Sequence, residues 1–176
     1  MRVFVAAALL LASAGCVVPI TIFGALQPYY SAGDFRREYA DKTHALGAVG
    51  CLDLAPAIRD VSGTVIMDFR AGNRCGDTVT VDLTQLHVYS TKGDGERVPA
   101  SLVDPNGEIR PLPLPARGQA FEPIALRGVP PERGSATELC LDFSSIAPAR
   151  PTETAHATLC FVHTEDRWLA APGSRS

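Results

Sequence analysis

Cysteine is the residue type whose spacing says most about the chemistry of this chain. Five cysteines occur: Cys16, Cys51, Cys75, Cys140 and Cys160. A zinc site nearly always contains two ligands within a few residues of each other, and the last four cysteines include no such close pair. We therefore expect two disulfides rather than a metal site.

The neighbours of two cysteines indicate how the four pair. Apolar residues flank Cys140 and Cys160 at positions symmetric about the segment Pro148–Thr152. A hairpin that turns there puts Cys140 opposite Cys160, and directly opposed residues of antiparallel strands lie within bridging distance. By elimination, Cys51 pairs with Cys75. In the chain-entropy model each bridge stabilises the fold by about 3 kcal/mol.

Histidine adds little chemistry to this picture. The chain has four histidines: His44, His87, His156 and His163. On one extended strand His156 and His163 point to opposite faces, so they cannot chelate one ion together. The sequence also lacks a G-x-S-x-G elbow, an H-E-x-x-H helix and a Walker phosphate loop. We expect no enzymatic activity, no cofactor and no metal. A cleft with two carboxylates about 5–10 Å apart would instead indicate a hydrolase.

The loop Gly72–Asp77 has two interpretations. Its arginine, Arg74, could bind a carboxylate of a partner. Alternatively, the loop is a turn pinned by the disulfide at Cys75, in which Asn73 and the glycines accept positive φ. The sequence favours the second interpretation.

The amino-terminal segment carries an export signal. Arg2 precedes an apolar run over residues 3–14, which is too short to cross a bilayer as a mature helix and is typical of a secretory signal peptide. The ending Leu11–Cys16 resembles the lipobox of bacterial lipoproteins, with Ser13 where the lipobox usually carries Leu. The resemblance implies that Cys16 is lipidated and becomes the first mature residue. The alternative is an ordinary signal peptide cut just ahead of this cysteine.

Lipidation of Cys16 agrees with the cysteine count. An unpaired thiol is a liability in an oxidising compartment, and the other four cysteines can then pair. The resemblance implies several acyl chains, and two or more chains hold a protein firmly to a membrane. Val17 follows the cysteine, where an Asp retains enterobacterial lipoproteins at the inner membrane. We expect localisation in the cell envelope, with the outer membrane favoured over the inner membrane.

The chain divides into four expected parts. They are a signal peptide at residues 1–15, a lipidated tether with a short helix at residues 16–47, a β-sandwich domain at residues 48–165 and a disordered tail at residues 166–176. Ser31 and Asp34 have the spacing of a capping box at the start of the helix. The net charge is −3 and no stripe of basic residues occurs, so we do not expect nucleic acid as a partner.

Alternating apolar and polar residues predict strands from residue 48 onward. The apolar set in Val65–Phe69 is mirrored about Arg74 by the set in Val79–Leu83. These segments either pair as a hairpin or face each other across a core. Further alternating segments lie at residues 86–88, 98–102, 121–126, 139–143 and 159–161. Short strands with frequent turns are typical of an antiparallel sandwich or barrel.

Prolines recur at every second position in the middle of the chain, at Pro111, Pro113 and Pro115. In an extended strand they remove every N–H donor from one edge. The segment Ile109–Pro115 is therefore expected to be an edge strand or polyproline-like. A proline-rich loop is the alternative.

The stretch Val65–Gly95 combines an alternating strand, a turn with Asn73, a second alternating strand with Asp82 and a glycine turn. In this order the parts resemble secreted bacterial immunoglobulin-like domains. The resemblance implies an all-β fold, an antiparallel immunoglobulin-like β-sandwich, and no particular function. The core tryptophan of true immunoglobulin domains is missing, because the one tryptophan, Trp168, lies near the tail.

These features together favour a membrane-anchored envelope lipoprotein that acts as a non-enzymatic protein-interaction or accessory module. Its expected partners are the membrane, through the lipid, and an unidentified envelope protein. The alternative is a small-molecule or glycan-binding module of the envelope. That alternative predicts a concave pocket lined by aromatic residues such as Tyr89 or Trp168.

Overall fold

The structure is a computed structural model and describes residues 31–92, 95–104, 108–129, 136–147, 157–164 and 167–174. The predictions for the leader, for Cys16 and for His156 concern residues outside this set. Within it, no helix is both long enough and apolar enough to span a membrane.

Strands dominate the described residues, and one short helix precedes them. The elements are α1 (Ala32–Glu38), β1 (Gly47–Val49), β2 (Leu52–Leu54), β3 (Ala57–Val61), β4 (Thr64–Asn73), β5 (Val79–Val81), the 3-10 turn η1 (Leu83–Gln85), β6 (His87–Lys92), β7 (Arg97–Val103), β8 (Leu112–Leu114), β9 (Gln119–Arg127), β10 (Ala136–Asp142), β11 (Thr158–His163) and β12 (Trp168–Ala170).

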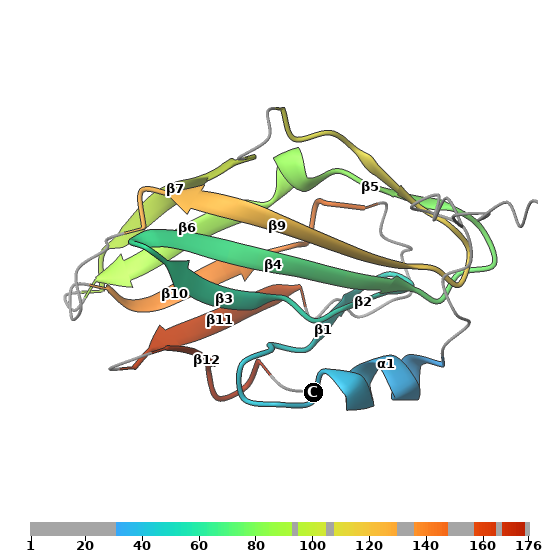
Figure 1. The fold of residues 1–176 in the computed structure, drawn as a ribbon, viewed down its shortest axis with the longest axis horizontal. Coiled ribbons are helices and arrows are strands. Elements are labelled where there is room, and N and C mark those ends of the chain that lie inside the picture. Colours follow the sequence, from blue (N-terminus) through green and yellow to red (C-terminus); the bar gives the residue numbers. More distant parts are fainter. Residues whose placement is uncertain are drawn as a thin grey trace, which may run out of the picture.

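The strands pack as two antiparallel layers, which confirms the predicted all-β sandwich. In the first layer β4 pairs with β2 and β3 along one edge and with β9 along the other. In the second layer β10 lies between β6 and β11, and β12 follows β11. Figure 1 shows β4 and β9 in front, with β10 passing behind them.

β7 connects the two layers by belonging to both. Its first half pairs with β6, where Ala100 lies opposite Val88. Its second half pairs with β9, where Val103 lies opposite Ala125. Because the strand changes partner midway, the sandwich is joined along this side by backbone hydrogen bonds.

The core fills the space between the layers. On β4 the alternate residues Val65, Met67 and Phe69 are buried, and Phe69 lies 6.1 Å from Phe143 between ring centroids. Burial of such apolar side chains stabilises the fold by about 1.5–3 kcal/mol each. The remaining large core residues come from both layers and include Leu52, Leu54, Leu83, Leu114, Ile124, Leu139, Leu141, Leu159 and Phe161.

The two mirrored segments do not form a hairpin. β5 pairs with β8 rather than with β4, because both edges of β4 are already occupied. Val81 belongs to the same core cluster as Met67. The hairpin alternative is therefore wrong, and the two segments face a common core.

The proline-rich segment forms an edge strand. Among the described residues β8 pairs with β5 alone, with Pro113 opposite Thr80 and Leu114 opposite Val79. Leu114 is buried in the core, while Pro113 is exposed. Pairing on one side only is what a strand without N–H donors along its other edge allows.

α1 packs on β2 and carries a second, smaller core. The Ser31 hydroxyl accepts a hydrogen bond from the Asp34 backbone N–H, and the Asp34 carboxylate accepts one in return from the Ser31 backbone N–H, so both orphan donors are satisfied. Phe35 is buried in one cluster with Leu46 and Ala55. The helix thereby covers the side of β2 that faces away from the main core.

The carboxy-terminal segment differs from the expected disordered tail. β12 pairs with β11, and Trp168 is only 3% exposed. The Ala170 backbone N–H donates to the Lys42 carbonyl, and the Leu46 backbone N–H donates to the Ser174 carbonyl. A strand of three residues is too short to produce periodicity, so the prediction missed it. Residues that were assigned to the tether and to the tail thus belong to the folded domain.

Candidate functional site

Both predicted cysteine pairs are present. Cys140 and Cys160 are opposed in the register of β10 and β11, with their Cα atoms 4.1 Å apart. Cys51 is bonded to Cys75, with a Cα–Cα distance of 5.6 Å. One bridge therefore fastens the second layer, and the other fastens the turn after β1 to the turn after β4.

Asn73 organises the loop that contains Arg74. Its side chain is fully buried, and its amide nitrogen donates to the carbonyls of Asp77, Leu114 and Pro115 at 2.8–3.0 Å. Its amide oxygen accepts from the Cys75 backbone N–H at 2.8 Å. Neither Asn73 nor the loop glycines adopt a positive φ, which corrects that part of the prediction. Side-chain hydrogen bonds, together with the disulfide, hold the turn.

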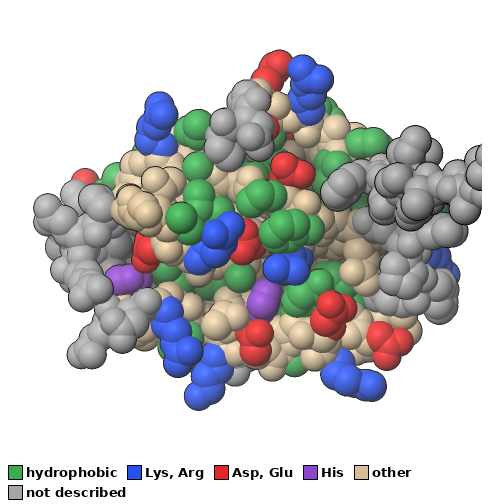
Figure 2. Space-filling view, viewed as in Figure 1, with side chains coloured by type: hydrophobic (Ala, Val, Ile, Leu, Met, Phe, Trp, Pro, Cys, Tyr) green, Lys and Arg blue, Asp and Glu red, His purple; other side chains and the backbone are tan. Residues whose placement is uncertain are grey.

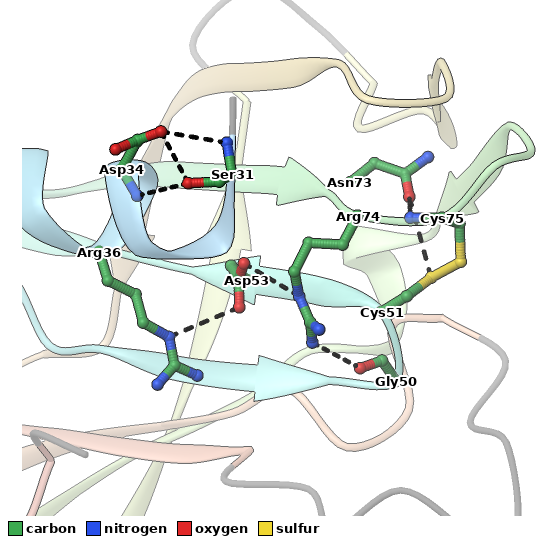
Figure 3. Close-up of polar contacts among 9 residues, drawn as sticks. All are labelled: Ser31, Asp34, Arg36, Gly50, Cys51, Asp53, Asn73, Arg74 and Cys75. Atoms are coloured by element: carbon green, nitrogen blue, oxygen red, sulfur yellow. Dashed lines mark hydrogen bonds and ion pairs between the residues drawn. A yellow bond between two sulfur atoms is a disulfide. The ribbon is translucent and has the colours of Figure 1, made fainter. Parts of the chain in front are cut away.

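Arg74 is engaged within the protein (Figure 3). Its Nε lies 3.0 Å from Oδ2 of Asp53, and its Nη2 donates to the Gly50 carbonyl at 3.3 Å. Arg36 of α1 approaches the other oxygen of Asp53 at 3.7 Å. Asp53 is 1% exposed, and burial raises the pKa of its carboxyl although Arg74 and Arg36 oppose the shift. We conclude that Arg74 fastens the loop to β2. Its guanidinium is occupied by this contact and does not serve to bind a carboxylate of a partner.

The described histidines lie apart from one another and do not form a common site. Nδ1 of His44 is 2.9 Å from a carboxylate oxygen of Asp41. Burial favours the neutral form of Asp41, yet hydrogen bonds from Thr43 and His44 hold its pKa well below the usual range. His163 approaches a different carboxylate, that of Asp60, at 3.4 Å, and His87 is exposed on β6.

Asp60 joins the free edges of the two layers. The indole Nε1 of Trp168 donates to its carboxylate at 3.2 Å, and the ring of His163 lies 4.9 Å from the Trp168 ring. Asp60 belongs to β3 and Trp168 to β12, so this contact closes the sandwich on the side opposite β7. Trp168 is therefore a core residue and not part of a ligand pocket.

Metal ligands gather at one place among the described residues. Glu138, Cys140 and Cys160 each bring one ligand atom within 4.8 Å of the others. The two cysteines form a disulfide, and a metal requires thiolates. This group therefore offers a metal one carboxylate only.

The solvent-facing side of the first layer carries an apolar surface, which we call the outer face. Residues opposed in antiparallel register share a face. The outer face consists of Ala57, Arg59 and Val61 on β3, Ile66, Asp68 and Arg70 on β4, and Phe121, Pro123 and Ala125 on β9. Phe121 and Val61, at 51% and 43% exposure, are the exposed large apolar side chains of the described residues. Figure 2 shows apolar side chains gathered at the centre of this side, with charged groups among them.

The two arginines of the outer face, one on β3 and one on β4, have different kinds of partner. Arg59 donates to Asp68 at 2.9 Å. Arg70 has no ion pair within the described part of the chain, and its guanidinium lies 4.5 Å from the ring centre of Phe121 and 5.2 Å from that of Tyr39. Stacking on both rings fixes the guanidinium plane. Arg70 is thus an ordered cation that can still meet an anion.

A cavity of about 230 Å³ opens between β9 and the segment that leads into β8. Its acidic side chains are Asp104, Glu108 and Glu122, and its one basic side chain is Arg110. Neither Tyr89 nor Trp168 lines it, contrary to the pocket that a glycan-binding module predicts. The sequence does not indicate this cavity, since no pattern relates residues of β9 to residues of the segment that precedes β8.

No family model matches this chain, and no curated protein or solved structure gives a match. The conclusions about function therefore rest on the outer face, the cavity and the amino-terminal sequence.

Proposed function

We propose that this protein is a lipid-anchored envelope protein that binds another protein through its outer face and performs no catalysis. The observation that carries the proposal is an aromatic ring and an ordered arginine, Phe121 and Arg70, on an exposed apolar sheet surface. Aromatic residues and arginine are enriched at protein interfaces, and the largest contributions to binding come from them.

The composition of the outer face supports docking of a partner. Its apolar members Val61, Ile66, Pro123 and Ala125 are partly exposed and surround the paired charges of Arg59 and Asp68. Contiguous exposed apolar surface of this kind marks interaction sites in soluble proteins. The ion pair within this surface favours a partner that carries complementary charges. It also disfavours nonspecific aggregation.

The scaffold beneath the outer face is suited to hold it rigid. β4 is ten residues long and is paired along both edges. The bridge from Cys51 to Cys75 ties the end of β4 to the turn between β1 and β2. Preorganised surfaces lose less conformational entropy on binding, so a docking role agrees with this construction.

The anchor is part of the same proposal and rests on the sequence. The ending Leu11–Cys16 resembles a lipobox, and two disulfides agree with an oxidising compartment. Val17 after the cysteine favours the outer membrane. The stretch Val65–Gly95 resembles secreted bacterial immunoglobulin-like domains. This resemblance agrees with export of the chain to the cell envelope.

The absence of catalysis is inferred from how the polar residues are engaged. His44 and His163 each contact a different carboxylate, those of Asp41 and Asp60. Nucleophilic catalysis needs a base beside a nucleophile and a third group that orients the base. None of the described residues that line the cavity is a serine, a cysteine or a histidine.

Binding of a small molecule or glycan is the second candidate, and the cavity is the place in the described residues where such a ligand would bind. Its volume of about 230 Å³ is below the range of about 300–1,000 Å³ that is typical of ligand pockets. Aromatic stacking, which sugars commonly need, has no counterpart there, since Trp168 lies in the core. The outer face therefore supports protein binding better.

The test is photo-crosslinking in intact cells with a photoreactive phenylalanine analogue at position 121. We expect a protein adduct of one defined mass, because Phe121 is the most exposed large apolar side chain of the outer face. The matched control places the analogue at Tyr89, which faces outward on the second layer, and should give no such adduct. Arg70→Gln should abolish the adduct from position 121. Equal adducts from both positions, or an adduct unaffected by Arg70→Gln, would contradict the proposal.

A further inference from the structure

The cavity exists because β7 leaves the first layer early. Val103 is the last residue of β7 that pairs with β9, and it lies opposite Ala125. The chain then runs through Asp104 and Ile109 to β8, which pairs with β5 instead. Among the described residues, the part of β9 that precedes Ala125 in the sequence has no strand partner on this side.

The floor of the cavity is apolar and fixed. Leu83 of η1 and Ile124 of β9 are both 2% exposed and belong to the main core. Ile109 and Leu112 pack against the same core from the segment leading into β8. A group placed here would touch side chains that are already held in position.

The remaining lining of the cavity is mostly acidic. Asp104, Glu108 and Glu122 supply three carboxyl groups against the single guanidinium of Arg110. No ion pair joins Arg110 to Glu108 or Glu122 in the described part of the chain, so these carboxylates are not neutralised by it. An anionic ligand would be repelled, and a neutral apolar one would desolvate the acids without compensation.

A metal ion does not fit this arrangement. Oxygen ligands of a cation must converge on one point within a few ångströms. The three carboxylates do not bring one oxygen each within 4.8 Å of the others, since the one such group in the described residues is that of Glu138, Cys140 and Cys160. The ligand must therefore carry its charge on a longer organic group.

We propose that the cavity binds an alkylammonium or guanidinium group on an apolar stem, which is the chemistry of a lysine or arginine side chain. An apolar cavity of about 150 Å³ accepts one benzene molecule, so about 230 Å³ has room for one side chain and not for a large cofactor. The stem lies on Leu83 and Ile124, and the cation meets Glu108 and Glu122 by charge-assisted hydrogen bonds. The site is separate from the outer face, and the proposal does not depend on docking there.

The test uses NMR titration of the full chain in detergent, with methyl resonances of Ile109, Leu112 and Ile124 as reporters. The probes are a blocked pentapeptide with a central lysine, the same peptide with norleucine, and free n-butylammonium. We expect saturable shifts with the lysine peptide and at least about tenfold weaker binding of the norleucine peptide, which has the stem without the charge. Tighter binding of the lysine peptide than of n-butylammonium identifies a protein side chain as the ligand, and equal binding identifies a free amine.

Variants link the binding to the acidic lining. Glu122→Gln and Glu108→Gln should each weaken binding of the lysine peptide by about tenfold. Glu108 is exposed, so its variant leaves the fold intact even if Glu122→Gln does not. Glu38→Gln on α1 is the matched control and should have no effect. Equal binding of the lysine and norleucine peptides, no saturable shift, or full binding by Glu108→Gln would overturn the proposal.

Discussion

Arg74 and Arg37 are both surface arginines paired with an aspartate, yet the two aspartates differ in how deeply they are buried. Arg74 contacts Asp53, whose side chain is 1% exposed. Arg37 contacts Asp34 at 3.9 Å, and both side chains are mostly exposed. An exposed pair contributes little because water solvates each charge equally well when they separate. A buried carboxylate that loses its partner keeps its desolvation penalty.

Arg74→Ala should therefore lower the free energy of unfolding by about 2 kcal/mol. The loss is smaller than for a fully enclosed pair, because the Arg74 side chain is 36% exposed and Arg36 still faces Asp53. Arg37→Ala, the matched control, should change the free energy by less than about 0.5 kcal/mol. Urea denaturation followed by circular dichroism measures both. Equal effects of the two substitutions would show that Asp53 does not depend on Arg74.

Single residues also mark how far sequence reasoning reaches. Asn73 is recognisable as a turn residue from its neighbours. Its bonds to the carbonyls of Leu114 and Pro115 are not, because these partners are 41 and 42 residues away and belong to an edge strand. The role of Arg74 depends on Asp53 in the same way. Local patterns indicate residue types that suit a turn, whereas the partners of a side chain follow from topology.

At the level of elements, strands with symmetric apolar flanks are the most predictable. The register of β10 and β11, with Cys140 opposite Cys160, follows from the sequence because a slip by one residue would expose the whole apolar face. The partner of β5 does not follow, since its apolar residues suit any strand that faces the core. The pairing with β8 depends on which edges are already occupied.

β12 lies in the segment that the sequence predicts to be a disordered tail, and its contribution to stability can be measured. Trp168→Ala should lower the free energy of unfolding by about 3–5 kcal/mol, since it empties a buried site and removes the hydrogen bond to Asp60. Arg167→Ala at the exposed neighbouring position should change it by less than about 0.5 kcal/mol. Chemical denaturation of the two variants compares them directly. A tail outside the cooperative fold would make both substitutions neutral.

At the level of the whole molecule, two closures give the sandwich its shape. β7 joins the layers on one side by backbone pairing, and the contact of Asp60 with Trp168 joins them on the other. Because β7 stops pairing with β9 at Val103, the cavity opens beside Glu122. The long pairing of β4 with β9 gives the outer face its extent. The two proposed binding sites therefore arise from the same arrangement of strands and lie on either side of β9.

The alternation of apolar residues predicts the sandwich itself, because each layer must bury one face. It cannot predict the cavity, whose lining combines Asp104 with Glu122 through the path of the chain between two layers. The outer face cannot be predicted from the sequence either. Phe121 has the same type as a core residue, and only the register that pairs it with Arg70 assigns it to the solvent side.

Export, oxidation and anchoring together form the central claim about the whole molecule, and intact-mass spectrometry of the protein from its native membranes tests them at once. We predict a chain that begins at Cys16, carries acyl chains on that residue, and offers no thiol to an alkylating reagent before reduction. After reduction, Cys51, Cys75, Cys140 and Cys160 should all be alkylated. A mass that includes the uncut leader, or four thiols alkylated without reduction, would contradict the account.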